Sequence, residues 1–189
     1  MKLLAALFSF VALVSAATCA LAETHAPFNP HADPVPAALA AGRGTSLLAD
    51  GVSELKFGEI FKLPIGPKGL ETSARLRSLD GQRVRMVGFM VARETATPGQ
   101  FIIAPLPVLL GDEDESFSDD LPANAVFVHL HPSLASQTVS NLHGPMQLVG
   151  TLRVGAHEEA DGRVSTVRLE LDATTSGLLF PISQNTAAR

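Results

Sequence analysis

The sequence has little of what thiol chemistry and nucleic-acid binding require. It contains one Cys in 189 residues, no Trp and no Tyr, and only 17% of its residues are charged. A single Cys excludes both an intrachain disulfide and a CxxC metal or redox pair. Nucleic-acid binders combine a cationic groove with stacking aromatic side chains, whereas this chain has a net charge of −5 and ten Phe as its only aromatic residues. We therefore expect a single domain that does not bind nucleic acid.

Motifs of the common catalytic classes are also missing from the sequence. There is no G-x-S-x-G nucleophile elbow and no G-x-x-x-x-G-K-S/T phosphate loop. The nearest approach to the metalloprotease motif H-E-x-x-H is His157-Glu158-Glu159, which has no second His. Glycosidase-like carboxylate pairs need only proximity in space, so the sequence leaves them open. The sequence favours a protein that is not an enzyme and has no cofactor.

Residues 1–22 have the pattern of a bacterial export signal. Lys2 gives a positive start, residues 3–14 form an apolar run, and Ala20-Leu21-Ala22 has the small-x-small form of a signal-peptidase site. We expect cleavage after Ala22, which leaves Glu23 as the new amino terminus and places the protein in the periplasm. No transmembrane segment then remains.

Two alternatives to cleavage at this site can be weighed from the residues. An uncleaved membrane anchor is disfavoured because the apolar run is shorter than the roughly 20 residues that span a bilayer. A lipoprotein would be acylated on Cys19, but Ala16-Ala17-Thr18 lacks the large aliphatic residue and the Gly or Ala usual before such a Cys. Cleavage after Ala22 removes Cys19, so stability must come from a hydrophobic core.

The remaining sequence predicts one β-rich domain behind a linker. Residues 23–45 are rich in Pro, Ala and Gly and predict a flexible tether, residues 46–180 form the domain, and residues 181–189 form a tail. Runs of Val, Ile, Leu, Met and Phe bounded by turn residues predict five strands, at residues 83–93, 100–109, 125–131, 146–154 and 164–173.

Turn and helix signals set the order of these strands. Thr97-Pro98-Gly99 and residues 159–162 suit hairpin connections. Short helices are predicted in residues 70–79, with Thr72 as a possible N-cap, and in residues 132–142. Three strands, a helix and two strands are the order of an OB-like five-stranded barrel, which closes on itself and so leaves no exposed edge.

A family resemblance agrees with this order. It is carried by residues 79–91 (LDGQRVRMVGFMV), Phe101-Ile102-Ile103-Ala104-Pro105, Asn124-Ala125-Val126-Phe127-Val128 and residues 145–152 (PMQLVGTL). Together they resemble an uncharacterised family, a domain of unknown function, of exported bacterial proteins with an OB-like core, over roughly residues 50 to 173. The resemblance implies a periplasmic, non-enzymatic protein. Many relatives carry a Cys and a His after the second strand, but residues 109–115 here have neither, so any thiol site of those relatives is absent.

Histidines offer the first candidate metal site. His129 and His131 share one face of a predicted strand, about 6–7 Å apart. His143 lies near the start of the next predicted strand. Three imidazoles could hold Zn²⁺ or Cu²⁺, although no carboxylate is tied to them by spacing. The alternative is a pair of solvent-facing histidines beside a Pro turn. A further candidate depends on cleavage after Ala22, because Glu23-Thr24-His25 would then wrap Cu²⁺ or Ni²⁺ in square-planar nitrogen geometry.

Two charged regions complete the candidates. The acidic residues between 112 and 120 lack the EF-hand Gly and Glu, which leaves a loose cation site, a solvated loop or a surface for a basic partner. An arginine cluster precedes them, and Arg83 and Arg85 share a strand face with Val87 and Phe89. That face is either solvated, a surface for an anionic ligand or partner, or paired with the acidic loop. The cluster contains Arg75, Arg77, Arg83, Arg85 and Arg93.

These observations favour an exported periplasmic binding or assembly accessory that acts on an envelope protein partner. The alternative is a periplasmic Zn or Cu handling protein that uses His129 and His131. A metal titration separates the two, because binding of an ion to the folded state raises its stability.

Overall fold

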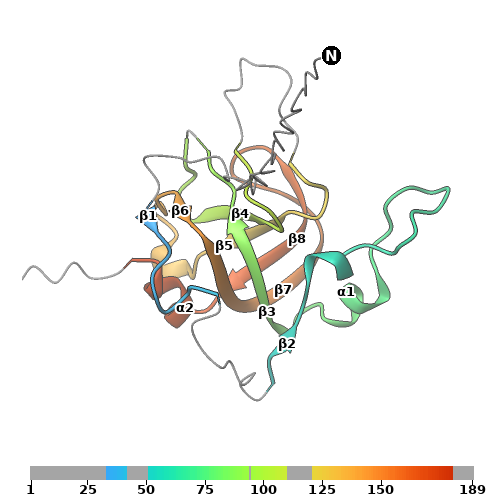
Figure 1. The fold of residues 1–189 in the computed structure, drawn as a ribbon, viewed down its shortest axis with the longest axis horizontal. Helices are drawn as coiled ribbons and strands as arrows, with labels where there is room; N and C mark the ends of the chain where they lie inside the picture. The colour runs from blue at the N-terminus through green and yellow to red at the C-terminus, as the bar shows by residue number, and fades with distance from the viewer. Residues whose placement is uncertain (1–32, 42–50, 94, 110–120, 181–189) are drawn as a thin grey trace, which may run out of the picture.

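The computed structural model describes residues 33–41, 51–93, 95–109 and 121–180 (Figure 1). This part of the chain is mainly β, with two short α-helices and two 3₁₀ turns. The expected signal and its cleavage site, His25, the acidic loop and the C-terminal tail lie outside the described residues. The elements are β1 Asp33–Pro34, β2 Ser53–Glu54, η1 Phe57–Glu59, α1 Ala74–Ser78, β3 Arg83–Met90, β4 Gln100–Ala104, β5 Val126–His129, η2 Pro132–Leu134, β6 Leu142–His143, β7 Pro145–Glu158, β8 Val164–Leu171 and α2 Ala173–Leu178.

The main sheet returns on itself. Its strand order is β2-β3-β4-β5-β8-β7, and β3 also pairs with β7, so β3, β4, β5, β8 and β7 form a hydrogen-bonded ring. Within the ring β5 and β8 run parallel, and the other neighbours run antiparallel. The ring strands are the five that the sequence predicts, and their order along the chain is confirmed. None of the helices among the described residues is long and apolar enough to cross a bilayer.

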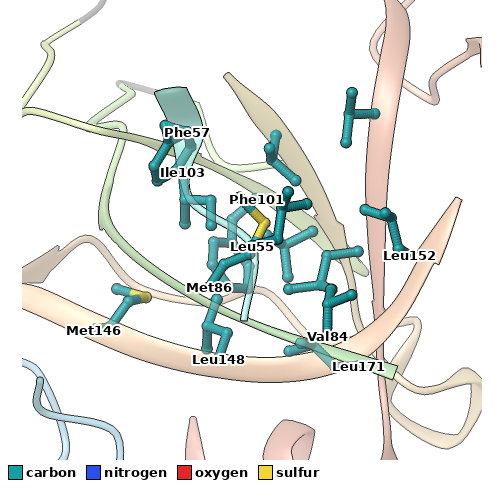
Figure 2. Close-up of a cluster of buried hydrophobic side chains, with 14 of the residues drawn as sticks. Leu55, Phe57, Val84, Met86, Phe101, Ile103, Met146, Leu148, Leu152 and Leu171 are labelled. Carbon is teal, nitrogen blue, oxygen red and sulfur yellow. The ribbon is translucent and has the colours of Figure 1, made fainter. Parts of the chain in front are cut away.

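Alternation along the strands produces the core. In β3 every second residue is buried, including Val84 and Met86, while Arg83 and Val87 are exposed. Figure 2 shows Val84 and Met86 in one cluster of buried side chains that also contains Leu148 and Leu152 of β7. Alternate positions of the third predicted strand fall in two separate clusters, but β5 ends at His129 and His131 caps η2, so the prediction that both histidines lie on the strand is wrong for His131. Val126, Val128 and Leu130 join the main cluster, and Phe127 joins a smaller one with Val91, Ile102, Ala104 and Ala125.

The long strand β7 closes the ring by pairing on both sides. Its first half pairs with β3 and its second half with β8, and Gly150 faces both Val84 and Leu171. A Cβ at Gly150 would lie 2.4 Å from the carbonyl oxygen of Glu170. Beyond Val154 a register irregularity shifts the pairing before His157. Such irregularities bend strands and redirect side chains, here next to the turn that leads into β8.

Several local expectations differ from the structure. Helix α1 is capped by Ser73, not Thr72, since the Ser73 side chain accepts the Leu76 N–H at 2.9 Å. The second predicted strand ends at Ala104, because Pro105 and Pro107 cannot donate to a ladder. The helix predicted in residues 132–142 is limited to the 3₁₀ turn η2. Residues after it bond to the β3–β4 connection instead, with Gln137 accepting the Gly99 N–H at 2.8 Å.

The described end of the expected tether is packed on the domain. Asp33–Pro34 pairs in parallel with β6, and Ala40 bridges Met146. Leu39 is 3% exposed and belongs to the main core cluster. Although residues 33–41 contain few large apolar side chains, one buried Leu and several backbone hydrogen bonds hold them. The flexible-tether expectation therefore does not describe residues 33–41.

Candidate functional site

A polar groove crosses the outer face of four ring strands. Strand register places His129 opposite Glu170, Glu170 opposite Thr151, and Thr151 opposite Arg83, so the four residues form one row across β5, β8, β7 and β3. The groove has a volume of about 460 Å³. Its other walls are the start of η2 and the start of α2. The lining residues are Arg83, His129, Leu130, His131, Pro132, Gly150, Thr151, Glu170, Leu171 and Asp172.

Opposite charges are paired along this groove. Arg83 Nη2 lies 2.6 Å from Asp172 Oδ2, and Arg153 Nε donates to Glu170 Oε2 at 3.0 Å. Asp172 also caps α2, because its Oδ1 accepts the Thr175 N–H at 2.7 Å. Burial by itself would raise the pKa of Asp172, but the hydrogen bonds from Thr175 and the nearby Arg83 outweigh it and hold the pKa below its ordinary value. The groove is thus lined by groups of both signs.

A buried carboxylate positions His129 at one end of this row. Glu159, in the turn between β7 and β8, has a side chain only 1% exposed. Its Oε2 lies 2.8 Å from His129 Nε2, and its Oε1 accepts the hydroxyl of buried Ser165. With Glu159 as an acceptor, Nε2 carries the imidazole proton. The His129 side chain is 28% exposed, so the ring connects a buried network with the groove.

The order of this network separates it from a hydrolytic triad. In a triad the imidazole stands between the nucleophile and the carboxylate, so it can take the nucleophile's proton. Here Glu159 stands between Ser165 and His129, and the Ser165 hydroxyl donates to the carboxylate. Ser165 is therefore hydrogen-bonded to a carboxylate and not to the imidazole that acts as the base in a triad. The arrangement orients an imidazole but does not build an acyl-transfer site.

The three histidines predicted as metal ligands have different surroundings. His129 is held by Glu159, whereas His131 Nδ1 accepts the Ser133 N–H at 3.3 Å as the cap of η2. His143 is exposed on β6, which pairs with β1 in a separate two-stranded sheet. Among the described residues, no group of three or more His, Cys, Asp or Glu side chains is arranged to hold a metal ion.

His157 lies next to His129, a contact that strand alternation does not predict. Its ring centroid lies 6.2 Å from that of His129, with the ring planes tilted by 58°. Glu159 and Ser165 were also missed as site residues. Their convergence depends on the β7 irregularity and on closure of the ring, and the sequence carries no local signal for either.

The arginine cluster is engaged within the described chain. Arg85 pairs with Glu54 at 3.0 Å, Arg83 pairs with Asp172, and Arg93 pairs with Asp161 at 3.1 Å. Arg75 donates to the Glu54 carbonyl at 3.2 Å, and Arg77 bonds to Thr72. The shared face of Arg83 and Arg85 predicted from alternation is confirmed. Among the described residues, Arg83 pairs with Asp172 and Arg85 pairs with Glu54, while the acidic loop lies outside the described residues.

A smaller cavity of about 210 Å³ lies at the base of a projecting arm. The arm spans residues 61–72, closed by bridges between Phe61 and Thr72 and between Gly66 and Gly69 (Figure 1). Except for Asn124, the lining side chains are apolar or absent, so this cavity offers little chemistry. They are Phe57, Gly58, Phe61, Leu63, Leu70, Ala123 and Asn124.

Comparison with known proteins gives a distant structural likeness. No protein-family model matches the sequence, and no curated protein matches it either. A matching solved structure is that of a DUF3299 family protein from Pseudomonas aeruginosa PAO1. Its TM-score is 0.40 at 14% identity, and the alignment covers 64% of this chain and 92% of that chain. No property of the groove follows from a likeness this distant.

Proposed function

We propose that this chain is an exported periplasmic protein with an OB-like core, that it acts as a binding or assembly accessory without enzymatic activity, and that the polar groove is its binding site. The partner is an envelope protein that places a polar segment in the groove. Export is supported by the pattern of residues 1–22, which combines a positive start, an apolar run and a small-x-small site.

The pairing order of the ring supports the OB-like assignment. An OB-fold is a five-stranded Greek-key barrel that binds its ligands on the outer surface of the strands and on the adjoining loops. Here the first ring strand, β3, pairs with both the second and the fourth, and the groove lies on the outer surface. A closed ring also offers few free strand edges, so a partner would be recognised by side chains more than by strand addition.

The groove's composition is the observation that carries the binding role. Arg83, Glu170 and Asp172 present charges of both signs beside Thr151, which suits a polar peptide segment more than a purely anionic or apolar ligand. Among the described residues, His129 is the only imidazole held by a buried carboxylate. The Ser165 hydroxyl in this network bonds to Glu159 and not to the His129 ring. Binding therefore fits these groups better than covalent catalysis.

Site-specific photocrosslinking tests the groove. A benzoylphenylalanine is placed at Pro132, which is exposed at the groove, or at Thr138, which is exposed in the same connection but outside the lining. Both chains are exported in cells and irradiated. We expect a defined adduct with an envelope protein from position 132 alone, and its loss when Arg83→Ala and Glu170→Ala are added.

Two results would overturn this proposal. Equal adducts from positions 132 and 138, or an adduct at 132 that survives the two groove substitutions, would show that the groove is not the binding site. Export is tested separately by intact-mass measurement of the periplasmic fraction, where a chain beginning at Glu23 is expected. A chain that stays in the cytoplasm would exclude the periplasmic role.

A further inference from the structure

Two imidazoles stand next to each other beside the buried Glu159 carboxylate. His129 comes from β5 and His157 from the end of β7, and their ring centroids are 6.2 Å apart. A tetrahedral Zn²⁺ shared by two imidazoles places the ring centroids roughly 5 Å apart, and a wider angle at the metal increases that separation to about 6 Å, given a Zn–N distance of about 2.0–2.1 Å. The observed separation of the centroids lies at the upper end of this range, and a shared ion requires both rings to turn so that one nitrogen of each faces it.

We propose that His129 and His157 together bind one divalent transition-metal ion of the Zn²⁺ and Cu²⁺ class. Water completes the coordination shell, because the described residues provide no third His, Cys, Asp or Glu ligand at this place. Such an open site exchanges its ion, unlike a closed structural site with four protein ligands. The proposal does not depend on what fills the groove.

The buried network prepares His129 for this role. Metal-binding histidines commonly donate their second ring N–H to a carboxylate, which fixes the ring and raises its basicity. Glu159 Oε2 accepts the Nε2–H of His129 at 2.8 Å, and Oε1 of the same carboxylate accepts the Ser165 hydroxyl. The lone pair of His129 is then on Nδ1, and no hydrogen bond from a described residue occupies that nitrogen. His157 is exposed, and its ring nitrogens are likewise not engaged by the described residues.

The other described histidines lack these features. His131 uses Nδ1 to accept the Ser133 N–H and hydroxyl, which holds the ring as a cap for η2. His143 is exposed on β6 without a carboxylate partner in the described chain. This difference in partners selects His129 with His157 rather than the His129 and His131 pair indicated by strand alternation.

Calorimetric titration with Zn²⁺ tests the site directly. All chains carry His25→Ala, so that a free Glu23-Thr24-His25 terminus cannot contribute. We expect one Zn²⁺ per chain, with at least a tenfold loss of affinity in His157→Ala. Matched His131→Ala and His143→Ala chains are expected to keep the parental affinity. Cu²⁺ electron paramagnetic resonance should show two imidazole nitrogens in the parent and one in His157→Ala.

The role of Glu159 is tested by Glu159→Gln, which keeps the size of the side chain. Loss of a carboxylate behind a metal-binding His typically lowers metal affinity about 10–100-fold, and we expect that loss with the stoichiometry unchanged. His157→Ala is the cleaner ligand variant, because His129→Ala would leave the buried carboxylate without its imidazole. Thermal unfolding without metal should be the same for His157→Ala and the parent.

Absence of Zn²⁺ binding in the parent would overturn the proposal. An equal loss of affinity in His131→Ala or His143→Ala would overturn it as well, because the ion would then be held elsewhere. Unchanged Zn²⁺ affinity in His157→Ala would show that His157 is not a ligand, and this result would also contradict the proposal.

Discussion

Arg93 and Asp161 join two connections at one end of the ring. Arg93 Nη1 lies 3.1 Å from Asp161 Oδ2, and the two side chains are only 17% and 11% exposed. The contact is an ion pair without the geometry of an aligned hydrogen bond. Oδ1 of the same carboxylate accepts the Arg163 N–H at 3.2 Å, which shapes the turn between β7 and β8. The pair thus holds the β7–β8 turn against the connection that follows β3. The same turn contains Glu159.

Asp161→Asn separates the ion pair from the turn. The amide oxygen can still accept the Arg163 N–H, but Arg93 is left largely buried without a counter-charge from the described residues. We expect a loss of about 2–3 kcal/mol in the free energy of unfolding, below the 3–5 kcal/mol of a fully buried pair because both groups retain some solvent. Urea denaturation measures it. The double variant Arg93→Met/Asp161→Asn should be more stable than the sum of the single losses predicts, and strict additivity would contradict the coupling.

Much of the ring could be predicted from the sequence because its strands alternate clearly. Val84, Met86, Val126 and Val128 recur at every second position, and a strand with one buried face has its register fixed by that pattern. Strand ends and helices were harder to predict, since they depend on single backbone partners. Residues 132–142 show this, because their helical spacing is overridden by the Gln137 carbonyl accepting the Gly99 N–H.

The candidate site could be predicted only in part. Alternation placed His129 on the strand face opposite Val126 and Val128, but its partner Glu159 is 30 positions away in a turn that the sequence indicates only as a hairpin. Glu159 lies in that turn, beyond the β7 irregularity, and is buried against His129 and Ser165. Contacts set by ring closure have no sequence period, so the link from His129 to Glu159 and His157 required the structure.

Because of Asp172, the stability of the fold should decrease as the pH falls through the acidic range. Its pKa is lowered in the folded state, so the stabilisation from this carboxylate is present above its unfolded pKa of about 3.9 and is lost as pH falls through the folded pKa. Asp172→Asn can keep the cap of α2 but cannot ionise. At pH 7 the free energy of unfolding of the parent should exceed that of Asp172→Asn by about 0.5 kcal/mol. The difference is small because solvent screens the ion pair with Arg83.

Urea denaturation of both chains at several pH values measures this difference. It should vanish as the pH falls well below 4 and should shrink in high salt, because salt screens the exposed pair. A difference between parent and Asp172→Asn that stays constant from pH 7 to pH 2 would contradict the assignment.

Gly150 is required where β7 passes from one partner strand to the other. A Cβ there would lie 2.4 Å from the Glu170 carbonyl oxygen and 2.9 Å from its carbon. Neither atom can move easily, since both strands belong to the ring. Gly150→Ala should lower the free energy of unfolding by about 2–3 kcal/mol through overpacking. Gly58→Ala, with no atom within 4 Å of the added Cβ, is the control and should change it by less than about 0.5 kcal/mol. Equal thermal stability of the two variants would contradict this reason.

Leu39 decides whether residues 33–41 belong to the domain. Its side chain is 3% exposed in the main core cluster, and its carbonyl accepts the Gln147 N–H of β7. Leu39→Ala should lower the free energy of unfolding by about 2–4 kcal/mol, because a cavity opens against the sheet. Ala38→Ser, at an exposed neighbouring position, should leave it nearly unchanged. Limited proteolysis should also cut residues 33–41 faster in Leu39→Ala than in Ala38→Ser. If both variants unfold at the same urea concentration and are cut at the same rate, these residues are a tether after all.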